Sequence, residues 1–128
     1  MGGLKTFRTL VLALTLAAAS PVCAADPLET LRMFADCTGR YTAVTEHLWL
    51  FDGPASEKTA ARRDQFADLV GAVAPDTDVS AAIILGWRIE ARAAQGALLS
   101  AATFRRDARA AATARAYITR CDRLLPGV

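Results

Sequence analysis

Residues 27–51 read PLETLRMFADCTGRYTAVTEHLWLF, and this stretch decides the fold class of the 128-residue chain. Pro27 suits the first turn of a helix, and Asp26 directly before it can cap that turn. Apolar side chains then recur at steps of three and four residues, which predicts a long amphipathic helix that the turn 52–54 ends. The residues on the predicted apolar face are Phe34, Cys37, Tyr41, Val44, Leu48 and Phe51.

Three further helices are expected after this stretch, over residues 56–73, about 78–104 and about 108–124. Ser56 is the expected cap of the second helix. Alanine is frequent and runs of β-branched residues are few, so the fold class is all-α. The predicted inner face of the third helix consists of Val79, Ile83, Trp87, Ala94, Ala97, Leu98 and Ala101, with Arg88, Arg92 and Gln95 on the opposite side.

Four helices joined by short turns favour a small antiparallel bundle in up-down-up-down order. The first and last helices are then antiparallel neighbours. Cys37 and Cys121 fall on the apolar faces of these two helices, at similar heights in the bundle. We therefore predict one disulfide that links the first helix to the fourth and stabilises the fold by about 4–5 kcal/mol in the chain-entropy model.

The first 24 residues have the pattern of a secretory signal peptide. Two basic residues precede the apolar run 10–19, and small residues around Cys23 offer a cleavage site. A retained membrane anchor is one alternative, but the apolar run is shorter than the roughly 20 residues that span a bilayer. Lipid attachment at Cys23 is another, although no small residue directly precedes this cysteine. We expect residues 25–128 to form a single helical domain that is periplasmic or secreted.

The net charge argues against a nucleic-acid partner. The chain has 15 basic and 13 acidic residues, and Lys5 and Arg8 lie in the predicted signal, so a cleaved chain has no net charge. The segment 88–128 is nevertheless rich in arginine. The arginines on one flank of the last helix are Arg106, Arg109, Arg120 and Arg123. This flank can face anionic lipid or an acidic partner, or it can pair with the acidic helices across the grooves.

Motifs for catalysis, metal binding and cofactor binding are missing from the sequence. His47 is the only histidine, which excludes multi-histidine zinc sites and two-histidine haem sites. No Ser-His-Asp arrangement, C-x-x-C pair or glycine-rich phosphate loop occurs. We therefore expect no catalytic residue, no metal and no cofactor.

The end of the first helix is apolar on every side. Leu48 and Phe51 belong to its apolar face, whereas Trp49 and Leu50 point in other directions. Either the following turn and the second helix cover this end, or it forms a surface for a partner. The candidate partner-contact residues are His47, Trp49, Leu50 and Phe51.

Glu90 is the second unusual position. Helical spacing places it between Trp87 and Ala94 on the apolar face of the third helix, where a carboxylate should be paired, protonated or at the rim. Arg40 and His47 are the expected partners from a facing helix. We predict that Glu90 is at least half shielded and forms a buried pair with one of them, and a ligand-binding or acid-base role is the alternative.

Together these features favour a small exported helical protein that acts as a binding or accessory module. Its expected partner is an unidentified protein of the cell envelope, and its oligomeric state is left open. The alternative is a peripheral envelope protein whose arginine-rich fourth helix makes weak contact with a membrane surface or an acidic partner. The third hypothesis is a small hydrolase that uses Glu90 and His47.

Overall fold

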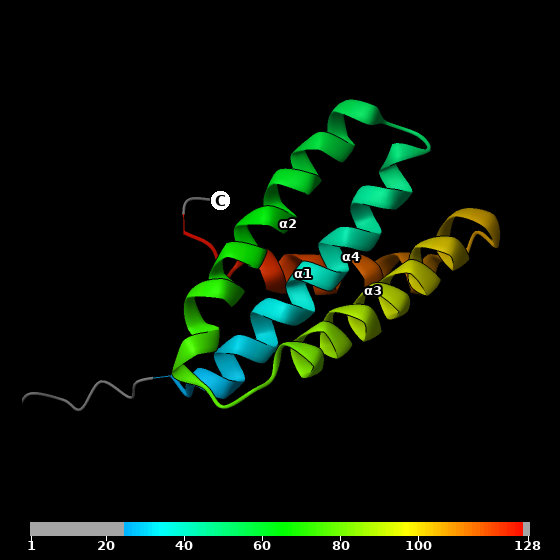
Figure 1. Ribbon diagram of the computed structural model, residues 1–128. Coiled ribbons are helices and arrows are strands. Elements are labelled where there is room, and N and C mark those ends of the chain that lie inside the picture. The colour runs from blue at the N-terminus through cyan, green and yellow to red at the C-terminus, as the bar shows by residue number, and fades with distance from the viewer. Residues whose placement is uncertain (1–24, 127–128) are drawn as a thin grey trace, which may run out of the picture.

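The computed structural model describes residues 25–126 and contains four α-helices and no strand in that range (Figure 1). The helices are α1 (Pro27–Trp49), α2 (Gly53–Val73), α3 (Ala81–Phe104) and α4 (Ala108–Asp122), and a short 3-10 turn, η1 (Ala74–Asp76), follows α2. The all-α prediction is confirmed. The predicted signal peptide, with Cys23, lies outside the described residues.

A polar side chain caps the start of every α-helix. Each cap accepts a hydrogen bond from a backbone N–H of the first turn, which has no partner inside the helix. The caps are Asp26, Asp52, Ser80 and Asp107, with oxygen-to-nitrogen distances of 3.0, 3.0, 3.3 and 3.0 Å. The prediction that Ser56 caps the second helix is wrong, because Gly53 and Pro54 already belong to α2. Ser56 is buried, and its hydroxyl donates to the backbone carbonyl of Thr45 in α1.

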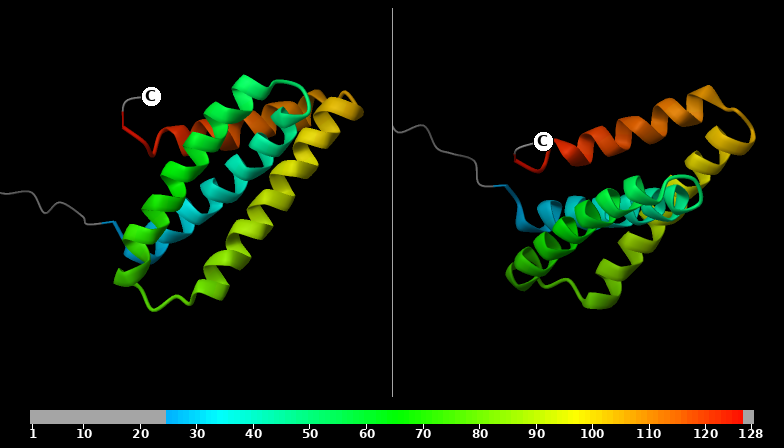
Figure 2. Two further views of the ribbon diagram at one scale, coloured as in Figure 1. Left: turned by 45° about the horizontal axis from the view of Figure 1, so that its top comes forward. Right: turned by 90° about the horizontal axis from the view of Figure 1, so that it is seen from above.

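The helices form a layer of three with the fourth across it. Figure 1 shows α1 between α2 and α3. Most of the contacts between different helices are those of α1 with these two neighbours. The left view of Figure 2 shows α4 crossing α1 and α2 obliquely, and the right view shows α4 on one face of the layer. The predicted up-down-up-down bundle is therefore not confirmed.

Two apolar clusters share α1 as their centre. The first lies between α1, α2 and α3, and its buried residues are Leu31, Ala35, Val70 and Ile84. The second joins α1, α2 and α4, and its buried residues are Cys37, Tyr41, Phe66 and Cys121. Phe34 packs against both clusters, and its ring lies 6.3 Å from that of Phe66, measured between centroids. The core is therefore continuous through the middle of α1.

The predicted disulfide is present at the centre of the second cluster. The Sγ atoms of Cys37 and Cys121 lie 2.07 Å apart and their Cα atoms 5.6 Å apart. This separation lies within the range of protein disulfides. The bond ties α4 to α1, and it is consistent with an oxidising compartment.

The predicted inner face of α3 is right in part. Ala101 is buried, and Val79 and Trp87 pack against the first cluster, as predicted. Ile83 is half exposed at 51%, however, and the buried residues Ile84, Ala91 and Gln95 lie outside the predicted face. The physical reason is that α3 is apolar or small on most sides, so its periodicity does not single out one face. The register is set by close packing on α1, where a Cβ atom at Gly39 would clash with the carbonyl oxygen of Arg88.

None of the helices in the described range is both long and apolar enough to cross a lipid bilayer.

Candidate functional site

Four large apolar side chains are exposed at one end of the molecule, where α1 and α3 end. We call them the apolar tip: Trp49, Leu50, Phe51 and Phe104, with exposed fractions of 79%, 73%, 60% and 70%. The turn after α1 and the helix α2 do not cover this end. The sequence left open whether the end of the first helix is covered or exposed, and in the described residues it is exposed.

A hollow of about 430 Å³ opens beside the tip between α1 and α3. Leu50, Ile89 and Phe104 line its apolar part, and Glu46 and Arg92 line its polar part. The carboxylate of Glu46 accepts from the Arg92 guanidinium at 2.7 Å, so these two charges neutralise each other. The hollow is thus an apolar depression whose charged side chains, Glu46 and Arg92, are paired with each other.

His47 lies at the wall of this hollow and is half-buried. Its Nε2 atom is 3.1 Å from the hydroxyl oxygen of Thr103, and its ring packs against Phe51 with centroids 5.1 Å apart. The ring therefore links the ends of α1 and α3 below the tip.

The prediction for Glu90 is wrong. Glu90 is exposed on α3 and pairs with neither Arg40 nor His47 in the part of the chain that the structure describes. The error follows from the register of α3, since the buried polar residue of this helix is Gln95. Glu90 does not line the hollow that contains His47, so the hydrolase hypothesis loses its pair of residues.

Arg40 is buried as predicted, but its partners are different. The side chain of Arg40 donates from Nε to Asp36 Oδ2 at 2.7 Å and from Nη1 to Gln95 Oε1 at 3.1 Å. Gln95, which is fully buried, donates in turn to the backbone carbonyl of Ala114 at 3.2 Å. The carbon of the Arg40 guanidinium lies 3.5 Å from the centre of the Tyr117 ring. This network joins α1, α3 and α4 through one buried charge.

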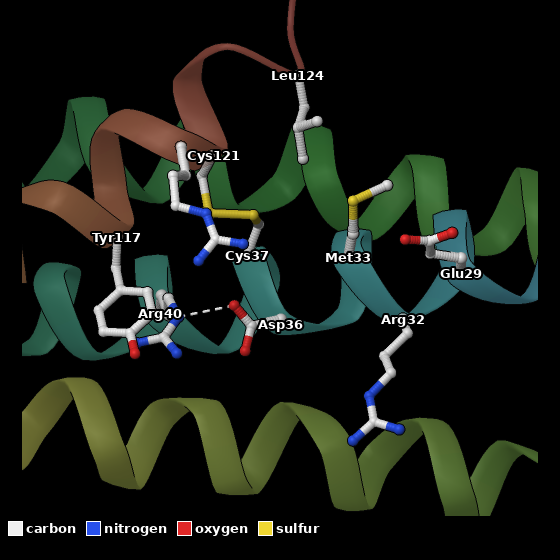
Figure 3. Close-up of a pocket in the computed structure, with 10 residues that line it drawn as sticks. Glu29, Arg32, Met33, Asp36, Cys37, Arg40, Tyr117, Cys121 and Leu124 are labelled. Carbon is white, nitrogen blue, oxygen red and sulfur yellow. Dashed lines mark hydrogen bonds and ion pairs between the residues drawn. A yellow bond between two sulfur atoms is a disulfide. The ribbon is translucent and has the colours of Figure 1, made fainter. Parts of the chain in front are cut away.

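A cavity of about 350 Å³ lies beside this network, between α1 and α4 (Figure 3). The polar groups of Arg40 and Asp36, the Tyr117 ring and the disulfide line one end. Figure 3 shows Met33 and Glu29 farther along α1, and Leu124 on the α4 side. Arg32 also lines the cavity, and its guanidinium extends toward α3, where it lies 5.2 Å from the centre of the Trp87 ring.

A second polar contact between helices lies on the other side of the disulfide. The hydroxyl of Tyr41 in α1 donates to Asp122 Oδ1 at the end of α4, and the same oxygen is 3.8 Å from Nε of Arg62 in α2. Burial of Tyr41, followed by the hydrogen bond to Asp122, raises the pKa of this hydroxyl well above its ordinary range. The contact holds α4 against the layer.

The four arginines of the predicted basic flank are all exposed: Arg106, Arg109, Arg120 and Arg123. Arg106 precedes α4 and has a positive φ of 54°, so helical spacing does not place it on a flank. Arg109 and Arg120 are separated by three turns, about 16 Å along the helix. Only Arg120 lines the cavity between α1 and α4. The arginines are therefore spread from the α3–α4 turn to the far end of α4.

One group of residues in the described range has the spacing of a metal site: Asp36, Cys37 and Cys121. The two sulfur atoms are bonded to each other, so they are not the thiolates that bind metals. Asp36 alone remains, and it already accepts from Arg40. The close spacing of these three residues therefore reflects the disulfide and the carboxylate beside it.

Sequence reasoning missed several residues of these sites, among them Asp36, Gln95 and Phe104. Asp36 and Arg40 are four residues apart on one helix, which is a readable signal for an ion pair. The periodicity places Gln95 on the outer side of its helix, and no local signal marks it as buried. Phe104 is distant in sequence from Trp49, so the local pattern does not group the two residues.

No protein-family model, no curated protein and no solved structure matches this chain.

Proposed function

We propose that this chain is an exported, periplasmic helical protein that acts as a binding or accessory module and contacts a protein of the cell envelope through the apolar tip. The carrying observation is the cluster of four large apolar side chains, each more than half exposed, at one end of the molecule. Exposed apolar patches of this kind mark interaction surfaces, and aromatic residues are enriched among the side chains that anchor interfaces.

The charges beside the tip indicate the chemistry of the partner. Arg105 and Arg106 follow Phe104 directly, are exposed, and make no ion pair with another described residue. A partner with an apolar side chain for the hollow and acidic groups beside it complements this surface in shape and charge. We therefore propose an apolar segment flanked by Asp or Glu as the bound element.

A membrane surface with anionic lipids is the second candidate. Trp, Phe and Arg together are typical of side chains at a lipid interface. The concave hollow favours a protein instead, because it fits a protruding side chain. The scattered arginines also argue for a protein, since they do not form a continuous basic face with the tip.

The double variant Trp49→Ala, Leu50→Ala tests the proposal. Its matched control is Ile83→Ala, Leu85→Ala, because these two apolar side chains are also about half exposed but lie at the start of α3. The partner is captured from the envelope fraction, purified, and titrated against each variant. We expect the tip variant to bind about tenfold more weakly or worse, with a free energy of unfolding within about 0.5 kcal/mol of the wild type. The control should bind normally.

Three outcomes would contradict the proposal. Equal affinity of the tip variant and the wild type would remove the tip as the contact surface. A large loss of stability would mean that Trp49 is a core residue. Salt-sensitive binding to phosphatidylglycerol vesicles, lost in the tip variant, would support the lipid candidate in its place.

Export is tested separately by sequencing the N-terminus of the protein isolated from the periplasm or the medium. We expect a start at Ala25 or Asp26, because the residues before them fit a cleavage site. A chain that retains residues 10–19, or that carries a lipid at Cys23, would contradict this part of the proposal.

A further inference from the structure

The hydrogen bonds of Arg40 indicate a second binding site, which is independent of the apolar tip. A guanidinium has five N–H donors, and Asp36 and Gln95 accept from two of them. No buried side-chain nitrogen or oxygen in the described range lacks a hydrogen-bond partner. Nη2 of Arg40 has no such partner among the described residues, so this nitrogen is not fully enclosed, and Arg40 lines the cavity between α1 and α4.

The guanidinium is held in one position before any ligand arrives. Asp36 fixes its Nε side, Gln95 fixes Nη1, and the Tyr117 ring covers its face. Gln95 is itself held by the carbonyl of Ala114. A buried guanidinium with fixed orientation and free donors is suited to a carboxylate, which can accept two parallel N–H bonds.

The rest of the cavity restricts the ligand further. Met33, Leu124 and the disulfide give it apolar walls, and Arg120 adds a second positive charge 5.9 Å from the centre of the Tyr117 ring. Glu29 and Arg32 line the other end, so that end carries one charge of each sign and no net positive charge. The volume of about 350 Å³ equals the space of about a dozen water molecules in the liquid.

We propose that the cavity between α1 and α4 binds a small molecule with one carboxylate on an apolar body, with Arg40 and Arg120 at the carboxylate. The site lies on the face of α1 that meets α4, whereas the apolar tip lies at the end of α1. The proposal therefore stands whether or not the tip binds a protein.

Nuclear magnetic resonance titration of the purified protein with benzoate tests this site. Benzamide is the neutral probe of the same shape, and inorganic phosphate is the anion without an apolar body. We expect saturable benzoate shifts at the Arg40 Nε–H signal and at residues around the disulfide, and affinities about tenfold weaker or worse for benzamide and phosphate. The Trp49→Ala, Leu50→Ala variant should bind benzoate as the wild type does.

Arg120→Gln is the matching variant, because Arg120 is exposed and its loss should leave the fold intact. Arg109→Gln is its control, an exposed arginine of α4 outside the cavity. We expect the first to weaken benzoate binding by about fivefold and the second to leave it unchanged. The site is overturned if benzoate gives no saturable shift up to about 20 mM. It is equally overturned if benzamide or phosphate binds as tightly, or if the two variants behave alike.

Discussion

Gly39 determines how closely α1 approaches α3. A Cβ atom at this position would clash with the carbonyl oxygen of Arg88 and lie 2.9 Å from the Cβ of Ala91. The carbonyl belongs to helix backbone and cannot move without shifting α3. The absence of a side chain at Gly39 is therefore a condition for this packing.

We expect Gly39→Ala to lower the free energy of unfolding by about 2–3 kcal/mol through overpacking. The matched control is Gly71→Ala on α2, where nothing lies within 4 Å of an added Cβ, and which should stabilise by about 0.5–1 kcal/mol through helix propensity. Urea unfolding of both variants measures the difference. A stabilised Gly39→Ala protein would show that α1 and α3 are not in close contact.

Tyr41 is a residue whose effect depends on pH. Its hydroxyl has a raised pKa, mainly because the ring is buried and next because it donates to Asp122. The folded-state pKa thus exceeds the unfolded value of about 10. The contribution of the protonated Tyr41 hydroxyl to the free energy of unfolding is therefore fully present below pH about 10. It is lost as the pH rises from there through the folded-state pKa.

We expect Tyr41→Phe to lower the free energy of unfolding by about 1–2 kcal/mol near neutral pH, because Asp122 loses its donor. The difference between the wild type and this variant should shrink as the pH rises above about 10. Chemical unfolding over a pH series measures it. A difference that stays constant to high pH would show that Tyr41 ionises as easily in the folded protein as in the unfolded chain.

At the scale of the element, α4 is the helix that depends most on a covalent bond. It packs mainly against α3, which precedes it directly, and meets α1 around the disulfide. Its sequence ARAAATARAYITRCD is rich in alanine and has few large apolar side chains. Burial alone therefore supplies little energy for docking α4 on the layer.

We expect the double variant Cys37→Ala, Cys121→Ala to lose about 4–5 kcal/mol of unfolding free energy if the chain-entropy model holds. Amide hydrogen exchange should show that α4 loses protection first, while α1, α2 and α3 keep theirs. Reduction of the wild-type disulfide should reproduce this pattern. Equal loss of protection in all four helices would contradict the independent docking of α4.

At the scale of the whole molecule, the buried polar network connects three helices that the apolar clusters hold together only in part. Arg40 belongs to α1, Gln95 to α3, and Tyr117 to α4. A single buried charge is costly unless every partner is in place, so breaking the network should destabilise the contacts of α1 with both α3 and α4.

We expect Arg40→Met to lower the free energy of unfolding by about 3 kcal/mol, because Gln95 and Asp36 lose their donor. A double-mutant cycle with Gln95→Leu measures the coupling, which should be about 1 kcal/mol or more. The control is Arg63→Met, which removes a surface ion pair with Asp64 on α2. This variant should change the free energy of unfolding by about 0.5 kcal/mol or less. Additive effects of Arg40→Met and Gln95→Leu would show that the two side chains act separately.

Local chemistry made the sequence-based predictions succeed where they did. The steps of three and four residues in α1, the capping aspartate Asp26 and the turn signals located the helices to within a few residues. Cys37 and Cys121 are the two cysteines outside the predicted signal, so their pairing required little more than counting. The apolar end at Trp49 was readable because one helix turn carried apolar side chains on every side.

What the sequence by itself determined is therefore the set of helices, the cap of α1, the disulfide and the apolar end of α1, since each depends on residues close in sequence or on a cysteine count. Only the tertiary structure decided the oblique crossing of α4, the exposure of Glu90, the burial of Gln95, and the meeting of Arg40 with Tyr117. Periodicity defines which residues share a face of a helix, but it does not define which face meets which neighbour. In α3, where most sides are apolar or small, that choice depends on the close contact at Gly39, and this contact exists only after α1 and α3 have packed.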